Sequence, residues 1–479
     1  MSEKRLIGRK DECRRLDRCM SSDSSQLIVV YGRRRVGKTF LVNEYFENRF
    51  AFKLTGVYGQ NKKAQLQNFT AELNRRSGKK FSIPSDWTTA FENLREYTES
   101  LPDDQKQVMF LDELPWLDTK KSGFLPAFEF FWNDYACTKN NIVFVLCGSA
   151  TSWMDEKITK NKGGLFNRQT CRIYLEPFKL HEVEKFLESR DISWSRYEIA
   201  ECYMIMGGIP YYLNMLNNEL SLRENIDLLF FRKKGELWDE FDHLYNTLFS
   251  NSEHYISVVE ALSAKRGGLT RNELLKKTGS SAGGEFSKVL NNLVLSGFVS
   301  VSEFYGKKKK DTVYCLADYY SLFYFKYIKN KHGKDEHFWT NSIDNPSRRA
   351  WEGLTFEHLC RDHIKQIKQK LGIAGVLSDE SVWFYRGDPD EGTSGAQIDL
   401  LIDRRDRVIS LCEIKFSLNE YEIDRDYDMD LRNKISVFSS VTSCRKTIQP
   451  VIITTYGLRK NKYSGLISAQ ITLDDLFSE

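Results

Sequence analysis

The segment GRRRVGKT, residues Gly32–Thr39, constrains the fold of this chain more than any other feature of its sequence. It fits the pattern GxxxxGK[ST] and lies between a strand-like apolar run, QLIVVY, and a helix-like stretch. Glycines let such a loop turn its backbone N–H groups toward phosphates, and the N-terminus of the following helix adds a field that favours anions. The sequence therefore predicts a phosphate-binding loop within an α/β domain.

The residues of this loop have distinct expected roles, and we expect ATP and Mg²⁺ as the ligands. Lys38 would contact the β- and γ-phosphates, and Thr39 would supply a hydroxyl to Mg²⁺. The residues expected to contact the nucleotide are Gly32, Arg33, Arg34, Arg35, Val36, Gly37, Lys38, Thr39 and Phe40, together with Ser149 from a later strand.

A second apolar run, VMFLDE, ends in the two carboxylates Asp112 and Glu113. Packing gives a buried strand no reason to end in two acids. Asp112 is placed to hold Mg²⁺, and Glu113 to act as a general base that polarises the attacking water. Ser149, at the end of IVFVLCGS, could sense the γ-phosphate or orient water, or it could cap a helix. Arg168 could be an arginine finger, supplied within a subunit or across one, or a surface arginine.

Five apolar runs between Leu27 and Leu175 alternate with helix-like stretches, which is the pattern of βαβ units around a buried parallel sheet. The pattern turns helical between Phe178 and Phe249. We expect a multidomain α/β protein with a P-loop core of the RecA/AAA type over residues 1–178, a helical lid over 179–250, a winged helix-turn-helix over 251–319 and a C-terminal α/β domain over 320–479.

The third predicted domain has two helices joined by a short turn and followed by two strand-like runs, FVSVSEF and TVYCLA. Its expected recognition helix, Glu285–Leu295, offers Lys288 and Asn291, and its expected wing tip, Gly306–Asp311, carries Lys307–Lys310. These residues suggest contacts with a DNA backbone. The alternative is a protein-interaction module whose lysines are solvated.

The last predicted domain places an acid on one strand and an acid and a lysine on the next. Asp399 lies in IDLLI, and Glu413 and Lys415 lie in VISLCEIK, where residues two apart point to the same face. Asp399 and Glu413 could hold Mg²⁺, while Lys415 could steady an attacking hydroxide or the developing phosphate charge.

Composition excludes few functions but narrows the setting. The formal net charge of +4 is too small to argue for nucleic acid by itself, and the longest apolar runs have the length of strands. The ten cysteines contain no CxxC pair, and His358 and His363 with Cys360 do not have zinc-ligand spacing. We expect a cytoplasmic protein with reduced thiols and no membrane partner.

Together, IGRKDEC, VVYGRRRVGKT, FLDELPWL, LCGSAT and GGIPYYL resemble the archaeal-type ATPase family, a branch of AAA-related, STAND-like P-loop ATPases, over about Leu6–Leu213. The resemblance implies a RecA-like core with catalytic Glu113 and a helical lid. Asn167-Arg168 stands at the family's usual Gly-Arg pair. The C-terminal pattern resembles the PD-(D/E)XK nuclease, or restriction-endonuclease-like, domain that often follows such ATPases, and Glu357 matches its additional helical acid and metal ligand.

Two functional hypotheses follow. The first is an ATP-hydrolysing protein that acts on DNA through a winged helix and a metal-dependent nuclease domain with Asp399, Glu413 and Lys415 as its catalytic residues. The second is an ATP-dependent regulatory switch that binds DNA or a protein partner and cleaves nothing. A finger role for Arg168 in trans would require a homo-oligomer.

Overall fold

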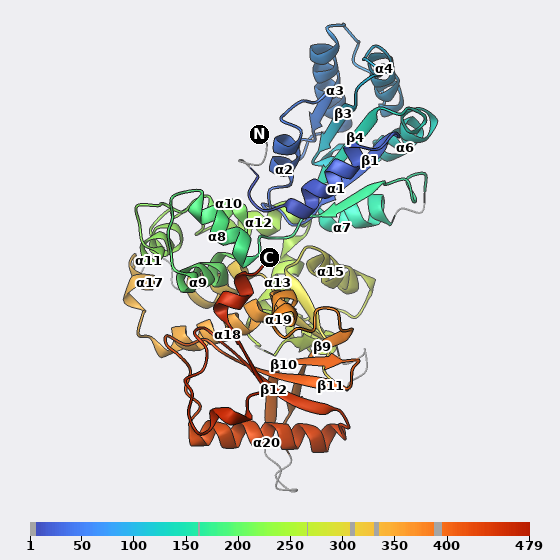
Figure 1. Cartoon of the computed structure of the whole chain (residues 1–479). Coiled ribbons are helices and arrows are strands. Elements are labelled where there is room, and N and C mark those ends of the chain that lie inside the picture. The colour runs from blue at the N-terminus through green and yellow to red at the C-terminus, as the bar shows by residue number, and fades with distance from the viewer. Residues whose placement is uncertain (1–5, 161–162, 266, 307–311, 330–334, 388–394) are drawn as a thin grey trace. The chain divides into compact units, whose positions relative to one another are not determined.

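A computed structural model of the chain describes residues 6–160, 163–265, 267–306, 312–329, 335–387 and 395–479 (Figure 1). The chain divides into two compact units. The first comprises Met1–Pro177 with Ile209–Tyr211, and the second comprises Phe178–Gly208 with Tyr212–Glu479. The finer division into four domains stays a prediction.

The first unit is built on a five-stranded parallel sheet with the order β2-β3-β4-β1-β5. Its strands are β1 (Gln26–Tyr31), β2 (Phe52–Thr55), β3 (Gln107–Asp112), β4 (Ile142–Gly148) and β5 (Cys171–Tyr174). The residues of β3 and β4 are all buried, as expected for parallel strands that are covered on both faces. Such strands need continuous apolar runs, which is the pattern seen in the sequence. The predicted α/β core with a parallel sheet is confirmed.

This strand order determines which loops meet. Strand β4 pairs with β1 on one side and with β3 on the other, so the segment after β4 lies between the segments that follow β1 and β3. In an open parallel sheet, ligands bind at the carboxyl ends of the strands. One edge of this sheet therefore carries the three parts of the predicted site: the phosphate-binding loop after β1, the acids at the end of β3 and Ser149 after β4.

Helices of the first unit cover both sides of this sheet, and a core of aromatic side chains that includes Phe91, Phe128 and Phe144 lies among them. The helices are α1 (Lys10–Met20), α2 (Lys38–Tyr45), α3 (Lys62–Ser77), α4 (Trp87–Glu99), α5 (Leu114–Leu117), α6 (Phe124–Asp134), η2 (Ala136–Thr138), α7 (Thr151–Met154) and η3 (Asp155–Thr159). Among the helices of the described residues, none is both long and apolar enough to cross a lipid bilayer.

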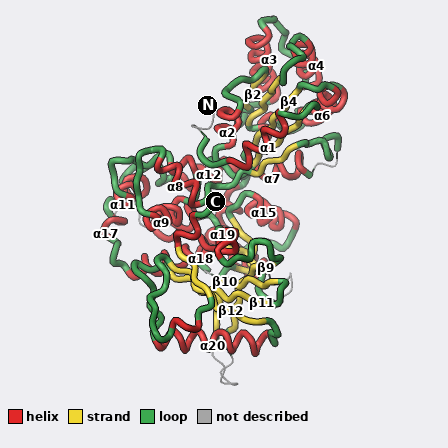
Figure 2. The backbone as a smooth tube through the Cα atoms, in the orientation of Figure 1, coloured by secondary structure: helices red, strands yellow, loops and turns green. Residues whose placement is uncertain are grey.

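The second unit begins with a helical segment, as the sequence predicts (Figure 2). Its helices, including one shared with the first unit, are α8 (Leu180–Glu188), α9 (Arg196–Met206), α10 (Pro210–Leu213), α11 (Leu222–Ile226), η4 (Asp227–Phe231) and α12 (Glu240–Leu248). These are followed, beyond residue 318, by α16 (Tyr319–Phe323), η6 (Tyr324–Ile328), α17 (Phe338–Asn341), α18 (Pro346–Asp362) and α19 (Ile364–Lys370).

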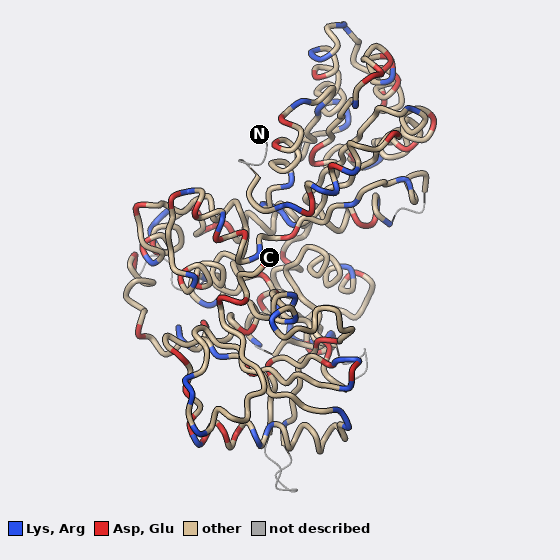
Figure 3. The backbone as a smooth tube through the Cα atoms, in the orientation of Figure 1, with Lys and Arg blue, Asp and Glu red and all other residues tan. Residues whose placement is uncertain are grey.

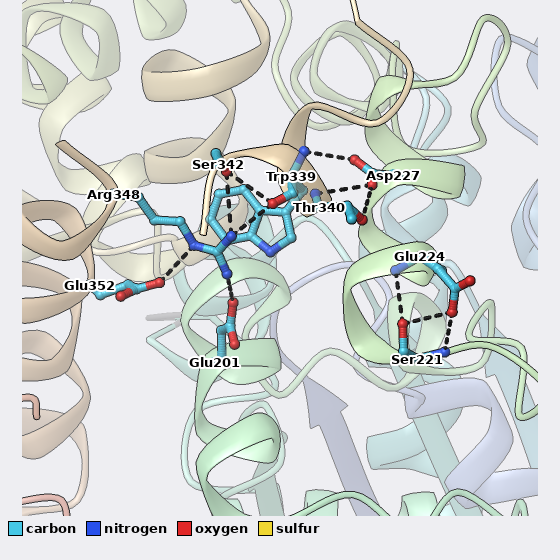
Figure 4. A network of polar contacts seen from close by, with 9 residues as sticks. All are labelled: Glu201, Ser221, Glu224, Asp227, Trp339, Thr340, Ser342, Arg348 and Glu352. Carbon is cyan, nitrogen blue, oxygen red and sulfur yellow. Dashed lines mark hydrogen bonds and ion pairs between the residues drawn. The ribbon is translucent and has the colours of Figure 1, made fainter. Parts of the chain in front are cut away.

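A buried ion cluster joins the early and late helices of this unit (Figure 4). Arg348 of α18 is 3% exposed, and its guanidinium donates to Glu352 at 2.8 Å and to Glu201 of α9. The same group donates to the carbonyl oxygen of Trp339 at 2.8 Å and lies over that indole ring. One buried arginine therefore pairs with two buried carboxylates and holds α18 against α9.

Between these helical segments lies a small sheet of order β6-β8-β7 with three helices. The elements are α13 (Ser252–Ser263), β6 (Leu269–Thr270), α14 (Arg271–Thr278), α15 (Gly284–Leu295), β7 (Val299–Ser302) and β8 (Val313–Leu316). The predicted helices and hairpin are present, and β6 was not predicted. The residues Lys307–Asp311 of the expected wing tip lie outside the described residues.

The C-terminal part of the second unit holds a five-stranded sheet of order β13-β12-β11-β10-β9. Its elements are β9 (Ser378–Tyr385), β10 (Ala396–Arg404), β11 (Val408–Lys415), α20 (Arg425–Thr442), β12 (Thr447–Thr454), η7 (Ser464–Leu466), β13 (Ala469–Thr472) and η8 (Leu473–Phe477). Strands β9, β10 and β11 are antiparallel neighbours, and β12 is parallel to β11 with α20 between them in sequence. Strands β10 and β11 lie where the sequence predicted them, and the sequence predicted neither β13 nor α20.

Two irregular contacts occur at strand β9. Two residues of β10, Asp399 and Leu400, lie opposite the single residue Val382 of β9, because the register shifts between Ile398 and Leu401. Val382 also forms a bridge with Phe304, which follows β7, and its carbonyl oxygen accepts the N–H of Tyr305 at 3.1 Å. The hairpin of the small sheet is thereby hydrogen-bonded to the edge of the C-terminal sheet.

Candidate functional site

The loop Gly32–Thr39 connects β1 to α2, where the sequence placed it. Gly32 has a φ of 145°, and a Cβ at this position would lie 2.5 Å from the carbonyl oxygen of Leu175. Gly37 has a φ of 89° and directly precedes α2. Residues with a side chain rarely adopt such angles, so the two glycines are required by the path of the backbone.

Lys38, the first residue of α2, is buried with 6% exposure. Its ammonium group donates to the carbonyl oxygen of Arg33 at 2.8 Å, so the side chain folds back over the loop. Burial lowers the pKa of Lys38, and Glu113 and Asp112 oppose that shift. Within the described residues, Nη1 of Arg34 is buried without a hydrogen-bond partner. A helix N-terminus with these cationic donors is suited to bind the phosphates of a nucleotide.

Thr39 and Asp112 meet at the carboxyl edge of the sheet. The Thr39 hydroxyl donates to Oδ2 of Asp112 at 2.9 Å, and Asp112 is 4% exposed. Hydroxyl and carboxylate oxygens are ligands that Mg²⁺ accepts, and the ion keeps further positions for water and phosphate oxygens. The two residues fit the predicted magnesium position of a nucleotide complex.

Glu113 and Ser149 form the other polar pair of this edge. Glu113 follows β3 with a φ of 47°, and its Oε2 accepts the Ser149 hydroxyl at 2.8 Å and the Ser149 N–H at 3.3 Å. Ser149 follows β4, and the N-cap of α7 is Ala150 without a side-chain cap. The Ser149 hydroxyl thus orients the carboxylate of Glu113, and the helix-capping alternative is wrong.

Arg9 and Tyr211 also contact the phosphate-binding loop, and the sequence predicted no role for either. Arg9 is buried and donates to the carbonyl oxygen of Val36 at 3.2 Å and to that of Glu176 at 2.8 Å. The guanidinium of Arg35 lies 4.3 Å from the ring centroid of Tyr211. The only signals in the sequence were the positions of Arg9 and Tyr211 within the motifs GRK and GGIPYYL.

Arg168 lies in an exposed turn that follows α7 and η3 in the chain. Asn167 before it has a φ of 54°, and the N–H of Arg168 donates to the carbonyl oxygen of Leu165 at 3.2 Å. Phe40, which follows Thr39, is 53% exposed. The finger role of Arg168 stays a prediction.

Asp399, Glu413 and Lys415 come together in the C-terminal sheet. Asp399 is 9% exposed, and its Oδ2 accepts the N–H of Ile414 at 3.1 Å. Glu413 is 1% exposed, and Nζ of Lys415 lies 3.6 Å from its Oε2. Burial and then the charge of Asp399 raise the pKa of Glu413. The shifted register at Asp399 is the kind of bulge that re-aims a side chain beside a functional site.

Helix α20 brings two side chains to the same carboxylate that the sequence did not reveal. Lys434 donates to Oε2 of Glu413 at 2.8 Å, and the hydroxyl of Tyr427 donates to the same oxygen at 3.0 Å. Burial acts to lower the pKa of Lys434, but the charge of Glu413, its hydrogen bond and the charges of Asp430 and Asp399 together outweigh burial, so the pKa is raised. The seven-residue spacing of Tyr427 and Lys434 predicts that both lie on one face of a helix, but it does not predict that this face contacts β11.

Glu357 and Cys360 lie on α18, which packs against β11. Burial raises the pKa of Cys360 well above its ordinary value, and the charges of Glu357 and Asp399 add to the increase. Across the described parts of the chain, no three His, Cys, Asp or Glu side chains are arranged to hold a metal ion. The metal-binding role of Asp399, Glu413 and Glu357 therefore stays a prediction.

The expected recognition helix is α15, and both residues singled out on it, Lys288 and Asn291, are exposed. Its apolar side includes Phe286, Leu290 and Leu293, which are buried. The helix therefore has an exposed side that carries Lys288 and Asn291. Its contact with DNA stays a prediction.

Comparison with known proteins agrees with the geometry of the first site. Residues 6–216 match the model of a family described as an ATPase domain predominantly from Archaea. An uncharacterized protein of Methanocaldococcus jannaschii is 24% identical over 438 residues, covering 90% of this chain and 92% of that protein. An uncharacterized ATP-binding protein of the same organism is 44% identical over 44 residues, covering 9% of this chain and 75% of that protein.

Solved structures with similarity to the chain include the Walker-type ATPase of Pyrococcus abyssi, at 16% identity and a TM-score of 0.49, covering 67% of this chain and 96% of that one. The ORC2 protein of Aeropyrum pernix has 15% identity and a TM-score of 0.42, covering 67% of this chain and 93% of that one. The family match includes the loop, Asp112 at the end of β3, Glu113 after it, and Ser149. Residues 6–216 of this chain therefore form an ATPase domain of the family found predominantly in archaea.

Proposed function

We propose that this chain is an ATP-driven switch that hydrolyses ATP with Mg²⁺ in residues 6–216 and acts on DNA through its second unit. The observation that carries the first half is the double pairing at one sheet edge, Thr39 with Asp112 and Ser149 with Glu113, beside Lys38. Such an edge holds one oxygen pair for a metal and one oriented carboxylate for water, which are the parts that phosphoryl transfer needs.

Each residue of this edge has a defined task in hydrolysis. Lys38 would exchange the Arg33 carbonyl oxygen for phosphate oxygens, which are better acceptors because they carry charge. Glu113, held by Ser149, would accept the proton of the attacking water. Thr39 and Asp112 would hold Mg²⁺, which when bound would neutralise charge on the phosphates.

The test is ATP hydrolysis by the purified full chain beside Lys38→Ala and Lys53→Ala. Lys53, on β2, donates to Asn43 at 2.9 Å and is the matched control because it is a lysine of the same sheet outside the loop. We expect hydrolysis to be lost in Lys38→Ala and kept in Lys53→Ala. Equal hydrolysis by Lys38→Ala and the wild type would refute the proposal.

The DNA-directed half is supported by the helix order of residues 252–316 and by the exposed Lys288 and Asn291 on α15. Acidic and basic residues are interspersed along the chain, so binding would depend on local groups and not on a basic block (Figure 3). Lys288→Ala is expected to weaken binding of duplex DNA and to reduce its salt dependence. Unchanged affinity in low salt would favour a protein-interaction module.

The C-terminal sheet is proposed to be a nuclease-like domain, on the strength of Asp399 beside Glu413 and Lys415 and of the strand order around them. A second candidate, a switch that binds without cleaving, is favoured by the contacts of Lys434 and Tyr427 with Glu413. Incubation of supercoiled plasmid with Mg²⁺ or Mn²⁺, with and without ATP, separates the two. Cleavage that Asp399→Ala abolishes supports the nuclease, and absence of cleavage with ATP hydrolysis intact supports the switch.

A further inference from the structure

The carboxylate of Glu413 is surrounded by protein cations. Its Oε2 lies 2.8 Å from Nζ of Lys434 and 3.6 Å from Nζ of Lys415, and it also accepts the hydroxyl of Tyr427 at 3.0 Å. Lys434 is 14% exposed and Glu413 1% exposed, so water screens this pair little. Lys434 also lies 3.4 Å from Asp430 on its own helix.

The placement of Lys434 follows from the pattern of α20. Tyr427, Leu431, Lys434 and Phe438 are spaced by four, three and four residues, which puts them on one face of the helix. Leu431 and Phe438 are buried in the core of the C-terminal sheet. Because these apolar residues anchor the helix, the tyrosine and the lysine between and beside them are directed at β11. The contact with Glu413 is therefore built into the packing of α20.

The same contact stands where a divalent cation would have to bind. A cation held by Asp399 and Glu413 needs carboxylate oxygens at about 2.0–2.6 Å. Oε2 of Glu413 already accepts Lys434 and Tyr427 and lies 3.6 Å from Nζ of Lys415, whereas Oε1 is buried and has no hydrogen-bond partner among the described residues. Oδ2 of Asp399 accepts a backbone N–H. Lys434 and Lys415 offset the charges of Asp399 and Glu413, with Asp430 as a further acid beside Lys434, so a divalent ion at Glu413 would meet an ammonium group on the same carboxylate.

We propose that Lys434 takes the place of a divalent cation at Glu413, so that the C-terminal site is closed to metal unless this ammonium group leaves the carboxylate. The inference deepens the proposed function, on which its relevance to DNA rests. It assigns the second unit to binding without cleavage in the arrangement described here. One side chain, Lys434, then separates this state from a metal-binding one.

Terbium luminescence tests the proposal without any assay of activity. Tb³⁺ bound beside Tyr427 is excited through that ring, and Asp399→Asn identifies the part of the signal that belongs to this site. In nucleotide-free full-length protein we expect weak Asp399-dependent binding, and in Lys434→Met a gain in affinity on the order of 10-fold. Lys446→Met is the matched control, because Lys446 pairs with Asp403 on the same sheet. Lys434→Arg, which keeps the charge, is expected to remain closed.

Asp399-dependent binding of Tb³⁺ that is equally tight in wild type and Lys434→Met would overturn the proposal. Thermal unfolding verifies that each variant is folded; if Lys434→Met is not, Lys434→Gln replaces it in the same titration, with the same gain expected. ATP hydrolysis measured on the same samples distinguishes a failure of the ATPase proposal from a failure of this inference. If ATP is not hydrolysed but Lys434→Met binds Tb³⁺ more tightly, the ATPase proposal fails and this inference stands. If ATP is hydrolysed but Lys434→Met gains no Tb³⁺ affinity, only this inference is refuted.

Discussion

Removal of the Ser149 hydroxyl is the sharpest single test of the nucleotide site. In Ser149→Ala, Oε2 of Glu113 loses the donor at 2.8 Å but keeps the backbone N–H of residue 149 at 3.3 Å. Glu113 would stay near the attacking water with a less well defined orientation. We therefore expect a lower kcat for ATP hydrolysis and an unchanged KM, since the hydroxyl contacts the proposed base, Glu113, and not the phosphate loop.

The magnitude follows from these contacts. A hydrogen bond to a charged group contributes about 1.5–3 kcal/mol, and the surviving N–H places the loss near the lower end of that range. A loss of about 1.5 kcal/mol corresponds to roughly a 10-fold decrease in kcat. Glu113→Gln, which removes the proposed base itself, should decrease kcat by about 10²–10⁴-fold.

Steady-state hydrolysis at saturating Mg²⁺ and ATP measures these rates, with Ser149→Thr as the control that keeps a hydroxyl. The double variant Ser149→Ala with Glu113→Gln is decisive, because two residues that act as a unit should not have additive effects. We expect the double variant to equal Glu113→Gln alone. Additive losses, or a rate of Ser149→Ala within about twofold of the wild type, would refute the role assigned to Ser149.

Two further predictions concern the second unit. Arg348→Met should lower the free energy of unfolding by about 3–5 kcal/mol, because it leaves Glu201 and Glu352 buried without their cation, and urea unfolding beside the exposed Arg349→Met measures it. Burial lowers the pKa of His363 from 6.5 to about 4, so the folded state excludes a proton that the unfolded chain binds. Stability should therefore be full above about pH 6.5 and fall by about 3 kcal/mol as the pH decreases to 4, and His363→Gln should flatten this dependence in urea unfolding at several pH values.

The nucleotide site could be predicted closely because its chemistry is local in sequence. Glycines at fixed spacing, a lysine at the start of a helix and acids at the end of an apolar strand each report their own environment. The parallel sheet followed from the alternation of apolar runs with helices. What the sequence could not supply was the order of the strands, which places Ser149 against Glu113 and so distinguishes its role from helix capping.

The C-terminal site was predicted only in part, because some of its residues come from a separate element of the chain. Asp399, Glu413 and Lys415 belong to one hairpin, so their proximity follows from strand geometry. Lys434 arrives from a helix whose only signal is an amphipathic pattern, and no pattern states which strand such a helix will cover. The role of Arg9 was not predicted because its guanidinium donates to backbone carbonyl oxygens, which every residue has whatever its side chain.

The bridge between Phe304 and Val382 also bears on how the protein can be dissected. Strand β9 is an outer strand of its sheet, and an outer strand offers unpaired backbone groups to any other chain. Tyr305 uses one of those groups and lays its ring 5.2 Å from that of Phe438. The hairpin of the small sheet thus covers the outer strand β9 at Val382. A fragment that begins after β8 would lose this cover and expose the backbone groups of β9, so a fragment that contains the C-terminal sheet should keep the chain from α13 onward.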